Sequence, residues 1–157
     1  MFKNRLLPVI LFLSLFMSAC GPAKPTEVIP QPLPSPTGDW TVTLTQSGGF
    51  AGVLLTVEVS SDGQLKAEDQ RSQRSVTQML SPQTMARLRQ LISNATVSSG
   101  PIPRSGCADC FIYDLTIASD GNSSQVHVDD TTLNNSGAAD LITFLRQLRD
   151  NALSASQ

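Results

Sequence analysis

This chain of 157 residues has one histidine and none of the common catalytic motifs. His127 lies between two valines in an alternating segment, so its side chain is expected to point to solvent, opposite the valines. The sequence has no Gly-x-Ser-x-Gly, no His-Glu-x-x-His, no phosphate-binding loop and no dinucleotide-binding glycine pattern. We therefore expect a protein that is not an enzyme and that needs no cofactor.

Clustered positive charge and long apolar runs are also missing. After residue 19, nine basic residues stand against thirteen acidic ones, a net charge of −4, and the basic residues form no cluster. Nucleic-acid binding depends on a positive surface, so no nucleic-acid partner is expected. The longest apolar run, 6–17, is about 12 residues, whereas a membrane-spanning helix needs roughly 20. A permanent transmembrane helix is therefore not expected.

The N-terminus has the three zones of a signal peptide. Lys3 and Arg5 precede the apolar run, and Met-Ser-Ala-Cys, residues 17–20, ends it. These four residues resemble the lipobox of bacterial lipoproteins. The resemblance implies a signal peptide over 1–19, cleavage before Cys20, and lipid on Cys20 that anchors the chain outside the cytoplasm. The protein would then be located at the cell surface or on the periplasmic side of a bacterial membrane. An ordinary signal peptide with an incidental cysteine is the alternative.

Residues 20–38 read as the lipidated cysteine followed by a linker. Six of the residues 21–38 are proline, which disfavours helix and sheet and favours extended polyproline II. At about 3.1 Å per residue this segment reaches at most roughly 55 Å. Residues 39–157 then remain for a single folded domain on this stalk.

Alternation and helical spacing predict an α+β domain over 39–157. Alternating apolar residues predict strands at 40–45, 53–59, 64–70, 111–117 and 125–129, with a possible short strand at 76–80 and a loop at 71–74. Ser81-Pro82 begins a predicted helix to residue 95, and a second helix is expected at about 137–153. The order β-β-β-α-β-β-α predicts two layers. An antiparallel sheet of four to five strands has one open face, and two helices cover the other.

Two cysteines, Cys107 and Cys110, remain beside Cys20. In an oxidising compartment this even pair favours a local disulfide before the strand at 111–117. A redox motif would sit between a strand and a helix, and zinc would want four ligands. Neither condition is met, so no metal is expected at this pair.

Asp129-Asp130, together with Asp120 or Asp114, raises the question of a calcium site. The spacing fits no EF-hand loop. Carboxylates exposed to solvent in turns are therefore expected, without a bound metal.

The most distinctive segment is Ser47-Gly-Gly-Phe-Ala-Gly52, between the first two predicted strands. Its glycines indicate positive φ or a close approach by another chain. Phe50 then either folds back onto the core or presents an apolar side chain to a partner. The candidate partner-binding residues are Gly48, Gly49, Phe50, Ala51 and Gly52.

This segment resembles the emfourin family, the protealysin-inhibitor type of protein. The hairpin around Asp62-Gly63, the helix start at Leu80-Ser81-Pro82, the strand at 111–117 and the leucine-rich last helix are similar too. The likeness extends over nearly all of 40–152. The resemblance implies inhibition of thermolysin-like zinc metalloproteases, which favour a bulky apolar side chain just after the scissile bond. The lipid anchor and the pair Cys107 and Cys110 depart from the family's cytosolic founding member.

Two functions from different classes fit the sequence. The first is a membrane-anchored lipoprotein that inhibits a thermolysin-like metalloprotease. The second is a non-catalytic module that binds another envelope or extracellular partner, for which the threonine-rich sheet face is available. Loss of peptidase activity at near-stoichiometric amounts of the domain would favour the first.

Overall fold

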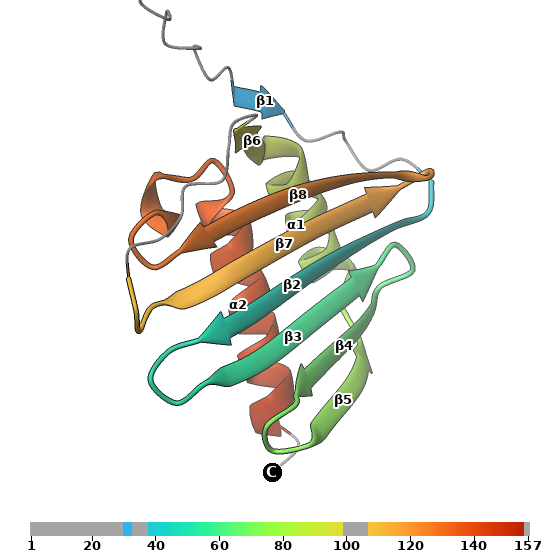
Figure 1. Cartoon of the computed structure of the whole chain (residues 1–157). Helices are drawn as coiled ribbons and strands as arrows, with labels where there is room; N and C mark the ends of the chain where they lie inside the picture. The colour runs from blue at the N-terminus through green and yellow to red at the C-terminus, as the bar shows by residue number, and fades with distance from the viewer. Residues whose placement is uncertain (1–29, 33–37, 99–106, 156–157) are drawn as a thin grey trace, which may run out of the picture.

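A six-stranded antiparallel sheet forms one layer of the protein, and two helices form the other (Figure 1). The computed structural model describes residues 30–32, 38–98 and 107–155. The predicted signal peptide, the lipidation site at Cys20 and most of the linker lie outside the described residues. The α+β class and the two-layer arrangement predicted from the sequence are confirmed.

The sheet has the strand order β5-β4-β3-β2-β7-β8, with each neighbour antiparallel. Its strands are β2 (Trp40–Gly48), β3 (Val53–Ser60), β4 (Gln64–Asp69), β5 (Arg74–Met79), β7 (Phe111–Ser119) and β8 (Asn122–Asp129). The predicted number of four to five strands was therefore too low. The residues expected as a loop at 71–74 give way to β5 at Arg74, because this weakly alternating segment is held extended by its pairing with β4.

Both helices lie on the same face of the sheet, as predicted (Figure 1). Helix α1 (Pro82–Asn94) begins after Ser81, whose hydroxyl oxygen accepts a hydrogen bond from the Thr84 N–H at 3.1 Å. Proline at the first helical position fits because that position has no intrahelical acceptor for an N–H. Helix α2 is the closing helix, Ala139–Ala155. Its start and end each lie two residues beyond the predicted 137–153.

The sequence did not predict a small second sheet or a turn of 3-10 helix. Strand β1 (Pro30–Pro32) pairs with β6 (Thr96–Ser98) in a separate two-stranded sheet. The sequence predicted a linker at the first segment and no element at the second. Proline is tolerated in strands that need no N–H from it, so a proline-rich segment can still form a short edge strand. A turn of 3-10 helix, η1 (Leu133–Asn135), lies between β8 and α2, where no element was predicted.

The core lies between the sheet and the two helices. Alternate residues of the central strands are buried there, as the period-two pattern predicted. They include Trp40, Val42 and Leu44 of β2, Val57 and Val59 of β3, Leu65 and Ala67 of β4, and Tyr113, Leu115 and Ile117 of β7. The opposite sheet face carries threonines of β2 and β7 and is open. Within the described residues, no helix is long and apolar enough to cross a bilayer.

Candidate partner-binding surface

The turn between β2 and β3 presents Phe50 to solvent. Gly52 donates its N–H to the Gly49 carbonyl at 2.9 Å, which closes a four-residue turn with Phe50 and Ala51 at its centre. We call residues 49–52 the Phe50 turn. The Phe50 side chain is 97% exposed, so the packing alternative for this residue was wrong. Gly48 is the last residue of β2, directly before the turn.

Two glycines of the Phe50 turn adopt positive φ for different reasons. Gly49 has φ +69°, and a Cβ there would lie 2.4 Å from a ring carbon of Phe111. Gly52 has φ +58° but open space around it. Gly49 therefore meets both a conformational and a steric requirement, whereas Gly52 meets only the first.

Contacts from both sides hold the turn. On one side the Gly49 N–H donates to the Cys110 carbonyl at 3.1 Å. On the other side the Arg71 guanidinium, from the β4–β5 connection, donates to the Ala51 carbonyl. These contacts cross-link an exposed turn to two other connections at the same end of the sheet. The turn is therefore preordered rather than a free loop.

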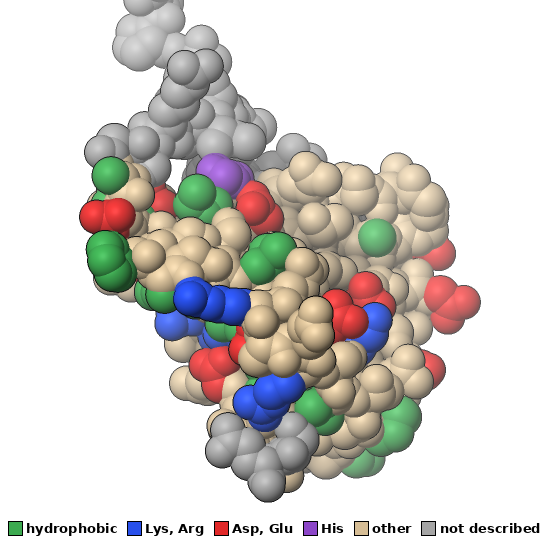
Figure 2. All heavy atoms as spheres, turned by 60° about the horizontal axis from the view of Figure 1, so that its bottom comes forward, with side chains coloured by type: hydrophobic (Ala, Val, Ile, Leu, Met, Phe, Trp, Pro, Cys, Tyr) green, Lys and Arg blue, Asp and Glu red, His purple; other side chains and the backbone are tan. Residues whose placement is uncertain are grey.

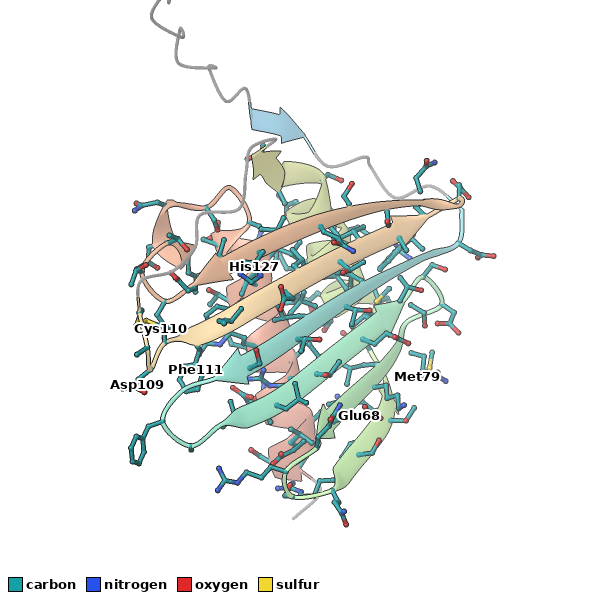
Figure 3. All side chains as sticks on the ribbon, in the orientation of Figure 1. Glu68, Met79, Asp109, Cys110, Phe111 and His127 are labelled. Carbon is teal, nitrogen blue, oxygen red and sulfur yellow. A yellow bond between two sulfur atoms is a disulfide. The ribbon has the colours of Figure 1, made fainter. Side chains whose placement is uncertain are left out.

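Cys107 and Cys110 form a disulfide, as the sequence predicted. We call residues 107–110 the disulfide turn. Figure 3 shows Asp109, Cys110 and Phe111 together at the end of the sheet where β7 begins. Cys107 and Asp109 are exposed, and Cys110 is half-buried. Among the described residues, no group of three His, Cys, Asp or Glu side chains is placed to hold a metal ion.

The carboxylates of Asp129 and Asp130 both accept hydrogen bonds within the fold. Asp130 is exposed, as the sequence predicted, whereas the burial of Asp129 corrects the expectation of a solvent-exposed turn residue. Asp129 is buried, and its Oδ1 accepts hydrogen bonds from the backbone and hydroxyl groups of Thr131 and Thr132 at 2.6–2.9 Å. Asp130 accepts from the Phe111 N–H at 2.8 Å and from the Tyr113 hydroxyl at 2.9 Å. Asp130 thus fixes the start of β7 beside the Phe50 turn.

Tyr113 links this carboxylate to the helix layer. Its ring lies beneath the Arg146 guanidinium of α2, 5.1 Å from ring centroid to Cζ. Burial, followed by the hydrogen bond to Asp130, raises the pKa of Tyr113 above the ordinary value of 10.0. The nearby guanidinium groups of Arg146 and Arg149 oppose this rise. The supports of the Phe50 turn therefore reach through β7 to α2.

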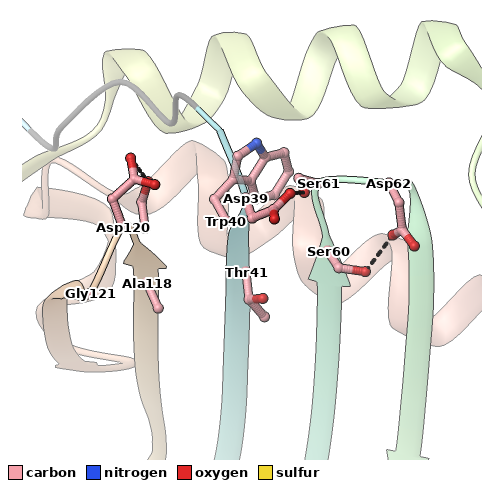
Figure 4. Close-up of a pocket in the computed structure, with 10 residues that line it drawn as sticks. Asp39, Trp40, Thr41, Ser60, Ser61, Asp62, Ala118, Asp120 and Gly121 are labelled. Carbon is pink, nitrogen blue, oxygen red and sulfur yellow. Dashed lines mark hydrogen bonds between the residues drawn. The ribbon is translucent and has the colours of Figure 1, made fainter.

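The other sequence candidates lie elsewhere. His127 is on the open sheet face, as predicted, with its Nδ1 2.5 Å from Asp114 Oδ1. At the opposite end of the sheet, Asp39, Asp62 and Asp120 line a shallow hollow (Figure 4). Asp62 is engaged in the β3–β4 turn, where the Ser60 hydroxyl and then the Gln64 N–H lower its pKa. These groups do not converge on the Phe50 turn.

Acidic and basic side chains are interspersed on the face shown in Figure 2, which brings the lower end of Figure 1 forward. Large exposed apolar side chains among the described residues are Phe50 and Met79, and Met79 lies at the far end of the sheet from Cys110 (Figure 3). Among the described residues, Phe50 thus combines an exposed aromatic side chain with a turn that is cross-linked to its neighbours.

A comparison with models of known protein families identifies one family in this chain. The family model Emfourin matches residues 70–146, and the chain thus contains an emfourin-family domain. The matched residues run from the β4–β5 connection into α2 and include the disulfide turn, while the Phe50 turn precedes them. The family is one of inhibitor domains rather than enzymes. A search of curated proteins finds no match to the chain.

The two glycines of the Phe50 turn provide a matched pair of variants. Gly49→Ala is expected to lower the free energy of unfolding by about 2–3 kcal/mol, because it adds overlap with Phe111 to the strain of positive φ. Gly52→Ala is expected to cost only about 1 kcal/mol, since open space surrounds it. Urea denaturation measures both values. Equal costs would contradict the tight contact between the turn and Phe111.

Tyr113 is the only tyrosine of the chain, so its titration can be followed by the ultraviolet absorbance of the phenolate. Because its pKa is raised, neutral Tyr113 stabilises the fold below pH 10.0, and this contribution is lost as pH rises through the folded pKa. Asp130→Asn removes the negative charge and leaves a weaker amide acceptor for the Tyr113 hydroxyl, so the titration midpoint is expected to move down. Asp114→Asn, on the open face, is the control and is expected to leave the midpoint unchanged. An unmoved midpoint in Asp130→Asn would refute this account of the hydrogen bond.

Proposed function

We propose that this protein is a membrane-anchored lipoprotein whose emfourin domain inhibits a thermolysin-like zinc metalloprotease, with Phe50 as the side chain that enters the protease. The observation that carries the proposal is the almost complete exposure of Phe50 on a turn cross-linked from both sides. The family match supports an inhibitor module. The choice of protease class rests on the resemblance of the glycine-phenylalanine segment to the family.

The physical basis is a bulky apolar side chain on a preordered turn. A protease that favours an apolar residue after the scissile bond offers a pocket that would bury the Phe50 ring. Ala51 and Gly52 beside it are small, so the main chain of the turn can approach a recessed metal closely. The turn is already closed and cross-linked, so binding costs less conformational entropy than ordering a free loop. An inhibitor of this kind needs no reactive group of its own.

The first test is titration of a thermolysin-like protease with the protein. Loss of peptidase activity at near-stoichiometric inhibitor is the expected result. Digestion of the protein, or unchanged peptidase activity, would favour the alternative of a binding module for another extracellular partner. Capture of a peptidase on immobilised protein would then identify the natural target.

Phe50→Ala is expected to raise the inhibition constant at least about 30-fold, because interface aromatics that fill a pocket contribute about 2 kcal/mol or more. The free energy of unfolding is expected to change by less than about 0.5 kcal/mol, since the ring has almost no contacts in the free protein. Met79→Ala, which removes the other large exposed apolar side chain found in the part of the chain that the structure describes, is the matched control. An unchanged inhibition constant in Phe50→Ala would exclude Phe50 as the anchor.

The membrane anchor is tested separately at Cys20. We expect the wild-type chain, expressed in a bacterium, to incorporate a labelled fatty acid, and Cys20→Ser to lose the label. Two or more acyl chains make such anchoring stable, at about 0.8 kcal/mol per buried CH₂. A variant with serine at both Cys107 and Cys110 controls for the other cysteines and is expected to keep the label. Label retained in Cys20→Ser would refute lipidation at this residue.

A further inference from the structure

We propose that the disulfide between Cys107 and Cys110 positions the Phe50 turn, so that the thiol redox state of this pair controls how strongly the surface binds its partner. The binding part of this inference rests on the proposed function. The positioning part rests on the contacts between the two turns and is tested independently of any partner.

One peptide group connects the two turns. The carbonyl of Cys110 accepts the Gly49 N–H at 3.1 Å, and the N–H on the other side of the same peptide, from Phe111, donates to Asp130 at 2.8 Å. The orientation of this peptide therefore sets the direction of the Gly49 hydrogen bond. Asp130 holds one side of the peptide. The disulfide constrains Cys110, the residue that supplies the carbonyl side of the peptide.

Packing reinforces the hydrogen bond. Phe111 follows Cys110 directly, and its ring occupies the space that a Cβ of Gly49 would need, at 2.4 Å. A shift of Cys110 therefore moves both the acceptor of Gly49 and the ring beneath it. Phe50 directly follows Gly49, so the direction of the Phe50 side chain depends on the contact between Gly49 and Phe111. Arg71, which binds the Ala51 carbonyl, remains as the second support after the disulfide opens.

The disulfide is placed where a reductant can reach it. Cys107 is exposed and Cys110 is half-buried, in a turn at the end of the sheet (Figure 3). A dithiol reductant breaks the S–S bond through a mixed disulfide. Two electrons and two protons pass to the cysteine sulfurs, which become thiols, and the dithiol closes to its own disulfide. No other covalent bond of the domain changes in this step.

The binding test uses the mature lipid-anchored protein in detergent and a thermodynamic cycle of variants. The variant with serine at both Cys107 and Cys110 is expected to show an inhibition constant about fivefold to tenfold higher. This rise corresponds to the net free energy that one hydrogen bond contributes. Serine replaces the cysteines because dithiols also bind the zinc of the protease. In the Phe50→Ala background the same two serine substitutions are expected to change the inhibition constant less than about twofold, since the disulfide acts through Phe50. An equal rise in both backgrounds, or no rise in either, would overturn the inference.

The positioning test needs no protease. Hydrogen exchange of the Gly49 amide is expected to speed up at least about tenfold when the disulfide is reduced and the thiols are alkylated. The Ser61 amide, which donates to the Trp40 carbonyl at the other end of the sheet, is expected to exchange at an unchanged rate. Unchanged exchange at Gly49 refutes positioning even if the protein inhibits a protease. Faster exchange at Gly49 in a protein that inhibits no protease supports positioning and refutes only the proposed function.

Discussion

The hydrogen bond from the Gly49 amide to the Cys110 carbonyl joins two connections that are about sixty residues apart in the sequence. It extends the antiparallel pairing of β2 with β7 by one step beyond the last pair, Gly48 with Phe111. An aromatic ring in water gains nothing from its exposure, and an unsupported four-residue loop would let it collapse onto the sheet. The pairing of β2 with β7, continued into the turn, therefore keeps Phe50 away from the core. The Asp130 carboxylate and the Tyr113–Arg146 contact carry this support to the helix layer.

The parts of the fold that the sequence predicted well have strong local periodicity. Trp40, Val42 and Leu44 alternate with threonines, and the structure buries all three apolar side chains. Ser81-Pro82 marked the start of α1 to the residue, since the cap and the proline each have a local physical cause. Strand β5 was uncertain because it is an edge strand in which only Val76 is apolar on the inner side. Its pairing with β4, which is not a local property, fixes its extended backbone.

The candidate site was located by its glycines, but its geometry was not predictable from the sequence. The glycines indicated unusual backbone at 48–52, whereas the exposure of Phe50 depends on contacts from Cys110 and Arg71. Arg71 was expected only as part of a polar loop, and nothing local marks its contact with a carbonyl twenty residues away. The contacts of Asp130 were missed for the same reason, because its partners Phe111 and Tyr113 come from β7 and are not apparent in the local pattern. Asp129 instead accepts hydrogen bonds from its neighbours Thr131 and Thr132, and what the sequence did not predict is its burial.

The direction of β2 has a consequence for the side from which a partner can reach the Phe50 turn. The strand begins at Trp40, where the chain enters the sheet, and ends at the Phe50 turn nine residues later. At about 3.3 Å per residue, these two points are roughly 30 Å apart. The start of the six-stranded sheet and the Phe50 turn therefore lie at opposite ends of β2. A partner that binds Phe50 would approach the end of the sheet that carries the disulfide turn and the β4–β5 connection, away from Trp40.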